Sequence, residues 1–322
     1  MSIRRVMVTG ATGLLGSHIV QSLVEQGFEV NALVRSYRNH SRWQRDGVQV
    51  YHGNLCDREH LYLAMQNCQA VIHAAADTSP ASHHFRRFKA VNVDPTSSLI
   101  DLSLQMGIQR FIFISTANCF AFGDRDHPGN EEKPAETWTL RSGYIKSKLQ
   151  AQQLVLQAVK DQGLPAIIMN PTFLLGNEEE PRSSNTIFRP ARLPIIPTAS
   201  GGKNFVDVRH VANTCIKGLH TGEPGECFLL AGVNASYREF YLKVLDIQGK
   251  QKPILVLPSW LLRTFGWVVY RMSYRLGQPT SINPWNMRLI SSNAYYSNSK
   301  ARNLLNLPAS DLEEMIRMYY AD

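Results

Sequence analysis

The feature that most constrains the fold is a regular alternation of short apolar runs with helical segments over the first half of the chain. The runs are rich in Val, Ile or Phe and apolar throughout, which is typical of parallel strands buried on both faces. The alternation predicts βαβ units and a doubly wound parallel α/β sheet. The expected strands are Arg5–Thr9, Glu29–Val34, Val48–His52, Ala70–His73, Phe111–Ser115 and Ala166–Asn170. The expected helices are Leu14–Gln26, His60–Met65, Phe85–Met106 and Tyr144–Gln162.

The second half of the chain reads differently, because prolines interrupt a loop-rich stretch after about residue 170. We expect residues 1–170 to form a Rossmann domain with its ligand at the carboxyl ends of the strands. Residues 171–322 are expected to form a smaller substrate-binding lobe, interleaved with the last strands of the sheet. Its expected helices are Val208–His220, Tyr237–Leu245, Pro258–Leu276 and Leu312–Tyr320.

The segment Trp260–Leu276 is apolar, aromatic and basic at once. One interpretation is a surface helix that contacts a membrane or covers an apolar substrate. The other is a helix that faces the core while its arginines extend to solvent. We expect the second arrangement, because amphipathic helices with an aromatic face are common in ordinary lobes.

Composition limits the class of protein. The net charge is +8, but the basic residues are scattered and lack a stripe interleaved with stacking aromatics, so no nucleic-acid partner is expected. Five cysteines lie far apart without a CxxC pair, which favours reduced thiols in the cytoplasm and no metal site. No signal peptide is expected, because the chain passes through Arg4 and Arg5 directly into a strand, and no stable membrane insertion is expected, because no apolar run approaches the length of a span.

A glycine-rich turn follows the first expected strand and opens the first expected helix. It reads TGATGLLG over residues 9–16. Gly10 permits the tight turn, Gly13 lets a diphosphate approach the backbone, and Gly16 lets helix and strand pack closely. The helix N-terminus offers free N–H groups to an anion. This context predicts dinucleotide binding by Gly10, Thr12, Gly13, Leu14, Leu15 and Gly16; a purely structural turn is the alternative.

The end of the second expected strand indicates which dinucleotide is bound. An NAD site has a carboxylate there that accepts hydrogen bonds from the ribose hydroxyls. This chain has no acid at that position, and instead presents Arg35, Ser36 and Arg38 to a 2′-phosphate. NADP(H) is therefore the expected cofactor. NAD remains the alternative, because Arg35 could stack on the adenine of either.

Two residues at the start of a long expected helix suggest the reaction. Tyr144 and Lys148 are four residues apart and share a helix face. A nearby ammonium, together with the charge of the cofactor, would lower the pKa of the phenol from about 10. The phenol could then exchange a proton with a carbonyl oxygen while a nicotinamide exchanges hydride. Tyr296 and Lys300 have the same spacing but lie far downstream, so we expect Tyr296 to pack or to contact substrate.

The fifth expected strand ends in two hydroxyl residues, Ser115 and Thr116. That end is where the nicotinamide would lie, and a hydroxyl there can hold the substrate oxygen against Tyr144. We expect Thr116 to be catalytic, with turn or helix capping as the alternative role.

The chain resembles the extended short-chain dehydrogenase/reductase family over essentially its whole length. The motifs that carry the resemblance are TGATGLLG, GNLCD at 53–57, VIHAAA at 71–76, VNVDPT at 91–96, FIST at 113–116, YIKSK at 144–148, NPTFLLG at 170–176, FVDVRHVA at 205–212 and YYSNSKARNLL at 295–305. The resemblance implies further cofactor-binding roles for Asn54, Leu55, Ala74, Ala75, Ala76, Asn92, Ser115, Pro171, Thr172 and Phe173. It also implies substrate contacts for Asp77, Thr78, Ala117 and Asn118.

Three functions remain open on the sequence alone. The first is an NADP(H)-dependent oxidoreductase of the dihydroflavonol-reductase or hydroxysteroid-dehydrogenase type, acting on a small apolar or aromatic carbonyl or alcohol. The second is an NAD-dependent nucleotide-sugar epimerase or dehydratase, which Asn170 disfavours because the family places arginine there. The third is a sensor that binds NADP without catalysis. The family commonly dimerises through the helices expected at Phe85–Met106 and Tyr144–Gln162, so the resemblance also implies a homodimer.

Overall fold

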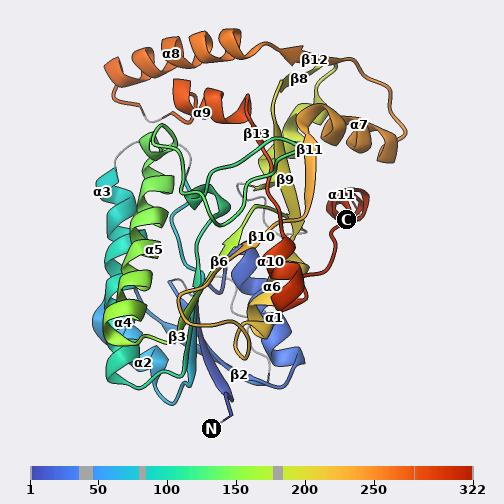
Figure 1. The fold of residues 1–322 in the computed structure, drawn as a ribbon. Coiled ribbons are helices and arrows are strands. Elements are labelled where there is room, and N and C mark those ends of the chain that lie inside the picture. Colours follow the sequence, from blue (N-terminus) through green and yellow to red (C-terminus); the bar gives the residue numbers. More distant parts are fainter. Residues whose placement is uncertain (1, 36–45, 80–84, 177–183, 279, 321–322) are drawn as a thin grey trace.

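The structure of the protein is a computed structural model that describes residues 2–35, 46–79, 85–176, 184–278 and 280–320. A seven-stranded sheet forms its lower half, in the order β10-β6-β5-β4-β1-β2-β3, and every neighbouring pair in it is parallel (Figure 1). The strands are β1 (Arg5–Thr9), β2 (Glu29–Val34), β3 (Val48–His52), β4 (Ala70–His73), β5 (Arg110–Ile114), β6 (Ala166–Pro171) and β10 (Cys227–Leu230). The expected parallel α/β sheet is confirmed, with β5 and β6 shifted by one residue at their ends.

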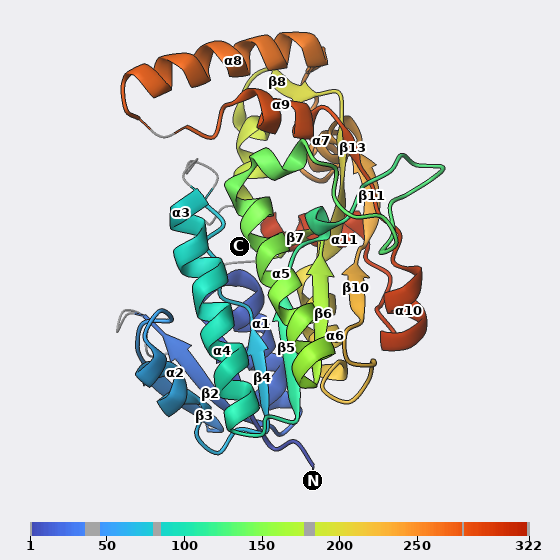
Figure 2. The same cartoon turned by 60° about the vertical axis from the view of Figure 1, so that its left-hand side comes forward.

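Helices cover both faces of this sheet, which explains why its strands are apolar throughout. In β1, Val6 and Val8 belong to the core beneath α1 (Leu14–Glu25) and α6 (Val208–Lys217). Met7 points to the opposite core, which is closed by the helices α2 (Arg58–Met65), α4 (Asp94–Gln105) and α5 (Gly143–Gln162). Figure 2 shows the pair α4 and α5 side by side over that face.

The expected single helix Phe85–Met106 is wrong in detail. The structure has a short α3 (Phe85–Phe88), a π-helical turn over Lys89–Val93 and then α4. Pro95 lies in the first turn of α4 and has no amide hydrogen to donate to a carbonyl of the preceding turn. The regular α-helical hydrogen bonds are therefore interrupted before Pro95, and a π-helical turn connects α3 to α4.

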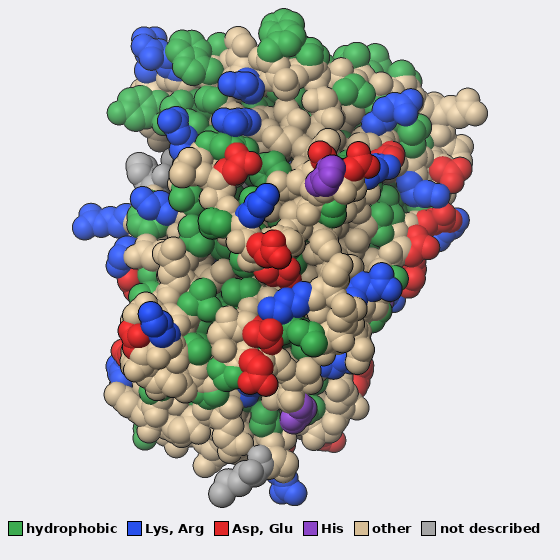
Figure 3. Space-filling view, viewed as in Figure 1, with side chains coloured by type: hydrophobic (Ala, Val, Ile, Leu, Met, Phe, Trp, Pro, Cys, Tyr) green, Lys and Arg blue, Asp and Glu red, His purple; other side chains and the backbone are tan. Residues whose placement is uncertain are grey.

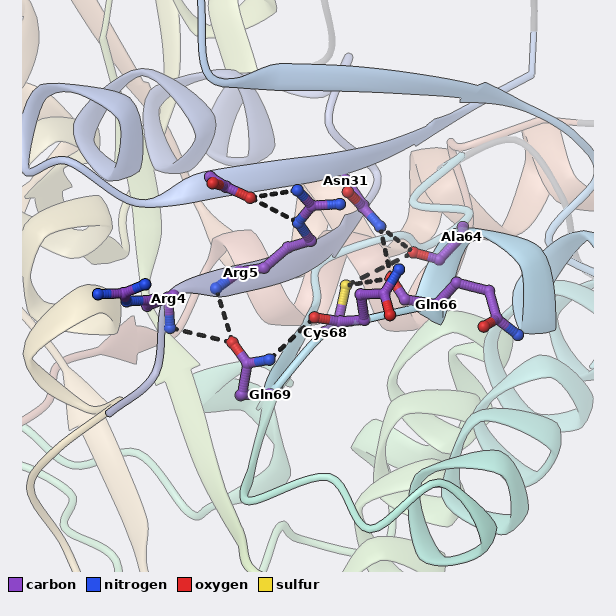
Figure 4. Close-up of polar contacts among 9 residues, drawn as sticks. Arg4, Arg5, Asn31, Ala64, Gln66, Cys68 and Gln69 are labelled. Carbon is purple, nitrogen blue, oxygen red and sulfur yellow. Dashed lines mark hydrogen bonds and ion pairs between the residues drawn. The ribbon is translucent and has the colours of Figure 1, made fainter. Parts of the chain in front are cut away.

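Polar side chains tie the amino-terminal ends of the strands together (Figure 4). The Gln69 Oε1 atom accepts hydrogen bonds from the backbone amides of Arg4 and Arg5, at 3.1 and 2.9 Å. Asn31, a buried polar residue within β2, donates from Nδ2 to the carbonyl oxygens of Ala64 and Gln66 at the end of α2. A buried amide in a largely apolar strand is thus used to fix a helix end.

The upper lobe is built on two small sheets. One contains β9 (Gly202–Asp207) with β7 (Phe173–Leu175), β11 (Val233–Ser236) and β13 (Asn293–Ala294), and the other pairs β8 (Ile196–Ala199) with β12 (Ile254–Leu257). The remaining α-helices are α7 (Tyr237–Ile247), α8 (Ser259–Arg275), α9 (Pro284–Ile290), α10 (Ser299–Leu305) and α11 (Leu312–Tyr320), and a 3₁₀ helix spans Ser184–Arg192. Because β10 and α6 return to the large sheet, the two halves of the chain are interleaved.

The expectation that residues 260–276 face the core is wrong. Helix α8 lies along the outside of the lobe, and Gly266 is its only buried residue. The exposed fractions of Trp260 and Trp267 are 67% and 54%. The helix packs on α9 through a glycine, where a side chain would overlap Met287, so its large residues point outward. No helix in the described ranges is long and apolar enough to cross a membrane.

Candidate active site

A cavity of about 750 Å³ lies between the large sheet and the upper lobe, at the carboxyl ends of β1, β4, β5 and β6. This is where ligands bind in open parallel sheets. Its wall contains most of the expected site residues: Gly10, Gly13, Leu14, Leu15, Gly16, Ala74, Ala76, Thr78, Ser115, Thr116, Ala117, Asn118, Tyr144, Lys148, Pro171, Thr172 and Phe173.

The glycine turn is shaped to bring backbone, and not side chains, to this cavity. Gly10 has φ +70°, and a Cβ atom there would lie 2.6 Å from the amide nitrogen of Ala75. A Cβ atom at Gly16 would overlap the carbonyl oxygen of Gly10. Helix α1 begins with Gly13 as its N-cap, with neither a capping side chain nor an acid in its first turn. The positive end of α1 is therefore available to an anion, as a dinucleotide diphosphate requires.

The expected 2′-phosphate site is described only in part. Arg35 follows β2 and is exposed to solvent, whereas Ser36 and Arg38 lie outside the described residues. Thr12 and Asn54 are exposed and Leu55 is buried; none of the three lines the cavity, and neither does Ala75.

Lys148 is the most buried charged group of the cavity wall, with an exposed fraction of 2%. Its Nζ atom donates a hydrogen bond to the carbonyl oxygen of Ile114 at 2.5 Å and lies 4.3 Å from the ring centre of Phe113. Burial disfavours the ammonium and lowers the pKa of Lys148 to about 8. Most molecules therefore have a protonated Lys148 at neutral pH, and a modest rise in pH deprotonates it.

Tyr144 differs from the expectation. Burial raises the pKa of its phenol to about 12, and a hydrogen bond with the Thr116 hydroxyl acts in the opposite direction without outweighing it. The ammonium of Lys148 is directed to the Ile114 carbonyl. In the protein alone, the cost of desolvating a phenolate therefore dominates, and the expected lowering of the pKa of Tyr144 by Lys148 is not found.

The two hydroxyls at the end of β5 are both engaged. Ser115 Oγ lies 3.4 Å from Cys119 Sγ. Thr116 Oγ1 accepts from the Asn118 amide at 3.3 Å and caps the short 3₁₀ helix Ala117–Cys119. Thr116 thus has the capping role that was the alternative, and its hydroxyl still reaches Tyr144.

Two buried asparagines make hydrogen bonds that fix the backbone and side chains around the site. Asn170 donates from Nδ2 to the carbonyl oxygen of Thr116 at 2.9 Å and to Gln152 Oε1 at 2.8 Å. Asn92 does not line the cavity: it bonds both backbone groups of Asp77 and the hydroxyl of Ser147 on α5. Asp77 in turn forms an ion pair with Arg87, and it also lies outside the cavity wall.

The upper lobe supplies further wall residues, of which the sequence had singled out only Tyr296, as a packing or substrate-contacting residue. Tyr296 is 4% exposed, and its buried phenol oxygen has no hydrogen-bond partner among the described residues. Lys203 lies 4.6 Å from the ring centre of Phe173, and burial lowers its pKa to about 8. Helix α9 adds Trp285 and Met287. Lys203 lies two residues before the FVDVRHVA motif, and this position was the only available signal.

Comparison with known proteins gives the family. A model of the NAD dependent epimerase/dehydratase family matches residues 6–231. The chain is 28% identical over 315 residues to a Synechocystis sp. protein named as a dihydroflavonol 4-reductase, covering 96% of this chain and 91% of that one. It is 32% identical over 269 residues to a 4-hydroxy-2-methyl-3-oxo-4-farnesyl-3,4-dihydroquinoline-1-oxide ketoreductase of Stigmatella aurantiaca, covering 79% and 76% of the two chains.

A solved structure supports the same fold. The UDP-glucose 4-epimerase of Thermus thermophilus, in complex with NAD, has a TM-score of 0.76 at 19% identity, with 98% of this chain and 99% of that chain covered. The match of the family model to most of the chain, and the named reductases among its relatives, agree with the motifs that line the cavity. The chain belongs to the NAD-dependent epimerase/dehydratase family and is an NAD(P)-dependent oxidoreductase of the extended short-chain dehydrogenase/reductase type.

Proposed function

We propose that the protein uses NADP(H) to reduce a ketone or aldehyde, or to oxidise the corresponding alcohol, of a small apolar or aromatic substrate. The observation that carries the proposal is the convergence of Tyr144, Thr116 and Lys148 on the cavity that the glycine turn enters. Bound there, the nicotinamide supplies or accepts the hydride. The chemistry left to the protein is to hold the substrate oxygen and to move one proton.

Each of the three side chains has a separate task in this proposal. The Tyr144 hydroxyl gives its proton to the carbonyl oxygen during reduction and takes it back during oxidation. The Thr116 hydroxyl, which lines the same cavity as Tyr144 and favours its phenolate, holds the same oxygen in place. Lys148 provides a cation behind the phenol, and its charge opposes the rise in the pKa of Tyr144 once a ligand draws it from the Ile114 carbonyl.

The proposed apolar substrate class is supported by the part of the cavity wall that α9 forms, which we call the roof of the cavity. Trp285, Met287, Leu289 and Ile290 of α9 line it beside the polar Asn286, and Phe88 lines its side. The apolar part of such a wall gains free energy by covering apolar surface, while a few polar groups fix the orientation of a ligand. Among the relatives, the Stigmatella aurantiaca ketoreductase is named for a substrate that carries a farnesyl chain.

One observation favours the second candidate, an NAD-dependent nucleotide-sugar epimerase or dehydratase. Lys203 is a cation in the cavity wall that forms no ion pair with an acid among the described residues, and it would suit an anionic group on a substrate. An enzyme of that kind returns the hydride to the same substrate and keeps its cofactor bound.

Cofactor preference distinguishes the two candidates. Titration of the purified protein, by calorimetry, should show NADP(H) binding at least tenfold more tightly than NAD(H), about 1.4 kcal/mol. Replacing Arg35→Ala should remove most of this preference by weakening NADP(H) and sparing NAD(H), because the proposed partner of the guanidinium is the 2′-phosphate, which NAD(H) lacks.

Arg302→Ala, on the exposed side of α10, is the matched control and should change neither affinity. A preference for NAD(H), above all with cofactor retained through purification, would move the epimerase or dehydratase function to first place.

Two further expectations remain part of this proposal. We infer a homodimer in which α4 and α5 pack against their symmetry mates, because these two helices lie side by side over one face of the sheet.

We also place the protein in the cytoplasm, since its five cysteines are all free.

A further inference from the structure

The basic residues are spread along the chain, but one long segment lacks acidic residues to balance them. Residues 247–310 contain no Asp or Glu, but they contain eight Lys and Arg residues, leaving 26 basic and 26 acidic residues in the rest of the chain. This segment forms β12, α8, α9, β13 and α10. This acid-free segment therefore accounts for the whole net charge of +8, and four of its cations, Arg263, Arg271, Arg275 and Arg288, lie on α8 and α9.

The outer side of α8 combines this charge with large apolar groups. Leu261, Phe265, Val268, Met272 and Leu276 follow one another at spacings of three and four residues, so they form one stripe along the helix. A second stripe is aromatic, with Trp260, Trp267 and Tyr274 seven residues apart and 67%, 54% and 79% exposed. Arg263, Arg271 and Arg275 lie among these residues, and all three are exposed.

The apolar surface continues beyond the helix. Leu255 and Val256 of β12 lead into α8, and Leu193 and Ile195 precede β8, the partner strand of β12. We call these four residues and the outer side of α8 the α8 surface. It holds 12 of the 17 large hydrophobic side chains that are exposed in the described part of the chain, so their exposure is a property of this surface and not of the molecule as a whole. In Figure 3 the top of the molecule, where α8 lies, shows green and blue atoms, and the red ones begin below it.

We propose that the α8 surface docks the protein on an anionic membrane, with α8 lying in the plane of the interface. Charge complementarity selects this occupant, because an acid-free cationic surface is attracted to anionic headgroups. Tryptophan and tyrosine are favoured at the boundary between headgroups and acyl chains, and the stripe of Leu261, Phe265 and Val268 can enter the apolar layer. The arginines keep their charged ends among the headgroups.

A second copy of the chain is a poorer occupant. A two-fold interface would bring the α8 surface against itself. Arg263, Arg271 and Arg275 would then face one another, and no acid on the segment could compensate them. The same reasoning disfavours any partner without an acidic face.

Docking of this kind would place the cavity roof at the lipid surface. Helix α9 packs directly under α8 through Gly266, and its residues Trp285 and Met287 line the cavity. An apolar substrate could then pass from lipid to cavity without crossing water. This consequence rests on the proposed function, whereas the docking itself depends only on the surface.

Co-sedimentation of the full chain with vesicles tests the proposal. We expect binding to vesicles of phosphatidylcholine mixed with phosphatidylglycerol, little binding to phosphatidylcholine alone, and weakening by added salt. Phe265→Glu should lower the partition coefficient at least tenfold, and Arg271→Ala with Arg275→Ala should lower it by about fivefold for each charge removed.

Leu63→Glu on α2, where the leucine is 45% exposed, is the matched control and should bind vesicles like the original protein. Unchanged circular dichroism spectra and thermal unfolding in all variants show that they are folded without reference to the cofactor, which keeps a failure of docking separate from a failure of the proposed function. The proposal is overturned if the protein does not bind anionic vesicles, or if it binds neutral vesicles as tightly as anionic ones. It is also overturned if Phe265→Glu converts a dimer to a monomer, measured by light scattering, without altering vesicle binding.

Discussion

Replacing Tyr144→Phe is expected to lower kcat for carbonyl reduction by about a thousandfold while changing the affinity for NADP(H) by less than about threefold. Phenylalanine keeps the ring that packs edge-on against Phe88 and removes only the hydroxyl next to Thr116. General acid catalysis by a positioned side chain contributes about 10²–10⁴-fold to a rate, so the loss of its proton should appear in kcat. Steady-state turnover and a cofactor titration measure the two effects separately.

Tyr296→Phe is the matched control, because Tyr296 lines the same cavity and has a lysine four residues later. Its phenol has no hydrogen-bond partner among the described residues, and it belongs to the upper lobe and not to the helix that carries Lys148, so we expect less than a tenfold loss. If Tyr296→Phe proved the more damaging variant, the proton-transfer role assigned to Tyr144 would be wrong.

The second large effect is expected from Gly16→Val. A side chain at this position would overlap the carbonyl oxygen of Gly10 and approach Ala11, which are rigid parts of the turn. Overpacking of this kind costs about 1–3 kcal/mol of the free energy of unfolding. The displaced turn should also weaken NADP(H) binding by more than tenfold. Urea denaturation and calorimetry measure the two changes.

Gly13→Ala separates the two contributions. Gly13 has φ −78°, which alanine adopts freely, and its Cβ atom would lie 3.2 Å from the carbonyl oxygen of Gly10, a close contact without overlap. We expect stability close to that of the original protein and weaker cofactor binding, because the added methyl group occupies the approach to the α1 N-terminus. A Gly16→Val protein that kept both its stability and its cofactor affinity would contradict the account of the turn.

The large sheet could be predicted from sequence because its information is local. Each strand is a short apolar run between helices, and buried parallel strands have no other common appearance. Pro95 was visible as well, but whether a proline kinks, breaks or π-bulges a helix depends on the packing around it. Helix α8 was correctly located and wrongly oriented, since an aromatic stripe has the same pattern whether it faces a core or the outside of the molecule.

The residues of the site also fall into a group that the sequence could identify and a group that it could not. Gly10, Tyr144 and Lys148 belong to continuous motifs, so the sequence alone was enough to name them. Lys203 reaches the cavity only because the upper lobe folds over the sheet, and no spacing in the sequence encodes that approach; Tyr296 was singled out by its spacing to Lys300, but that spacing left open whether it packs or contacts substrate. The raised pKa of Tyr144 was also beyond the sequence, because it follows from burial by residues distant in the chain.

The measurement that tests the central claim most directly is the stoichiometry of hydride transfer. Incubated with NADPH carrying deuterium at the transferable position and with an apolar ketone that it turns over, the protein should oxidise one NADPH for each alcohol formed. The deuterium should appear on the carbinol carbon. Conversion of a nucleotide sugar with no net change in the cofactor would contradict the account, because the hydride would then have returned to the molecule that supplied it.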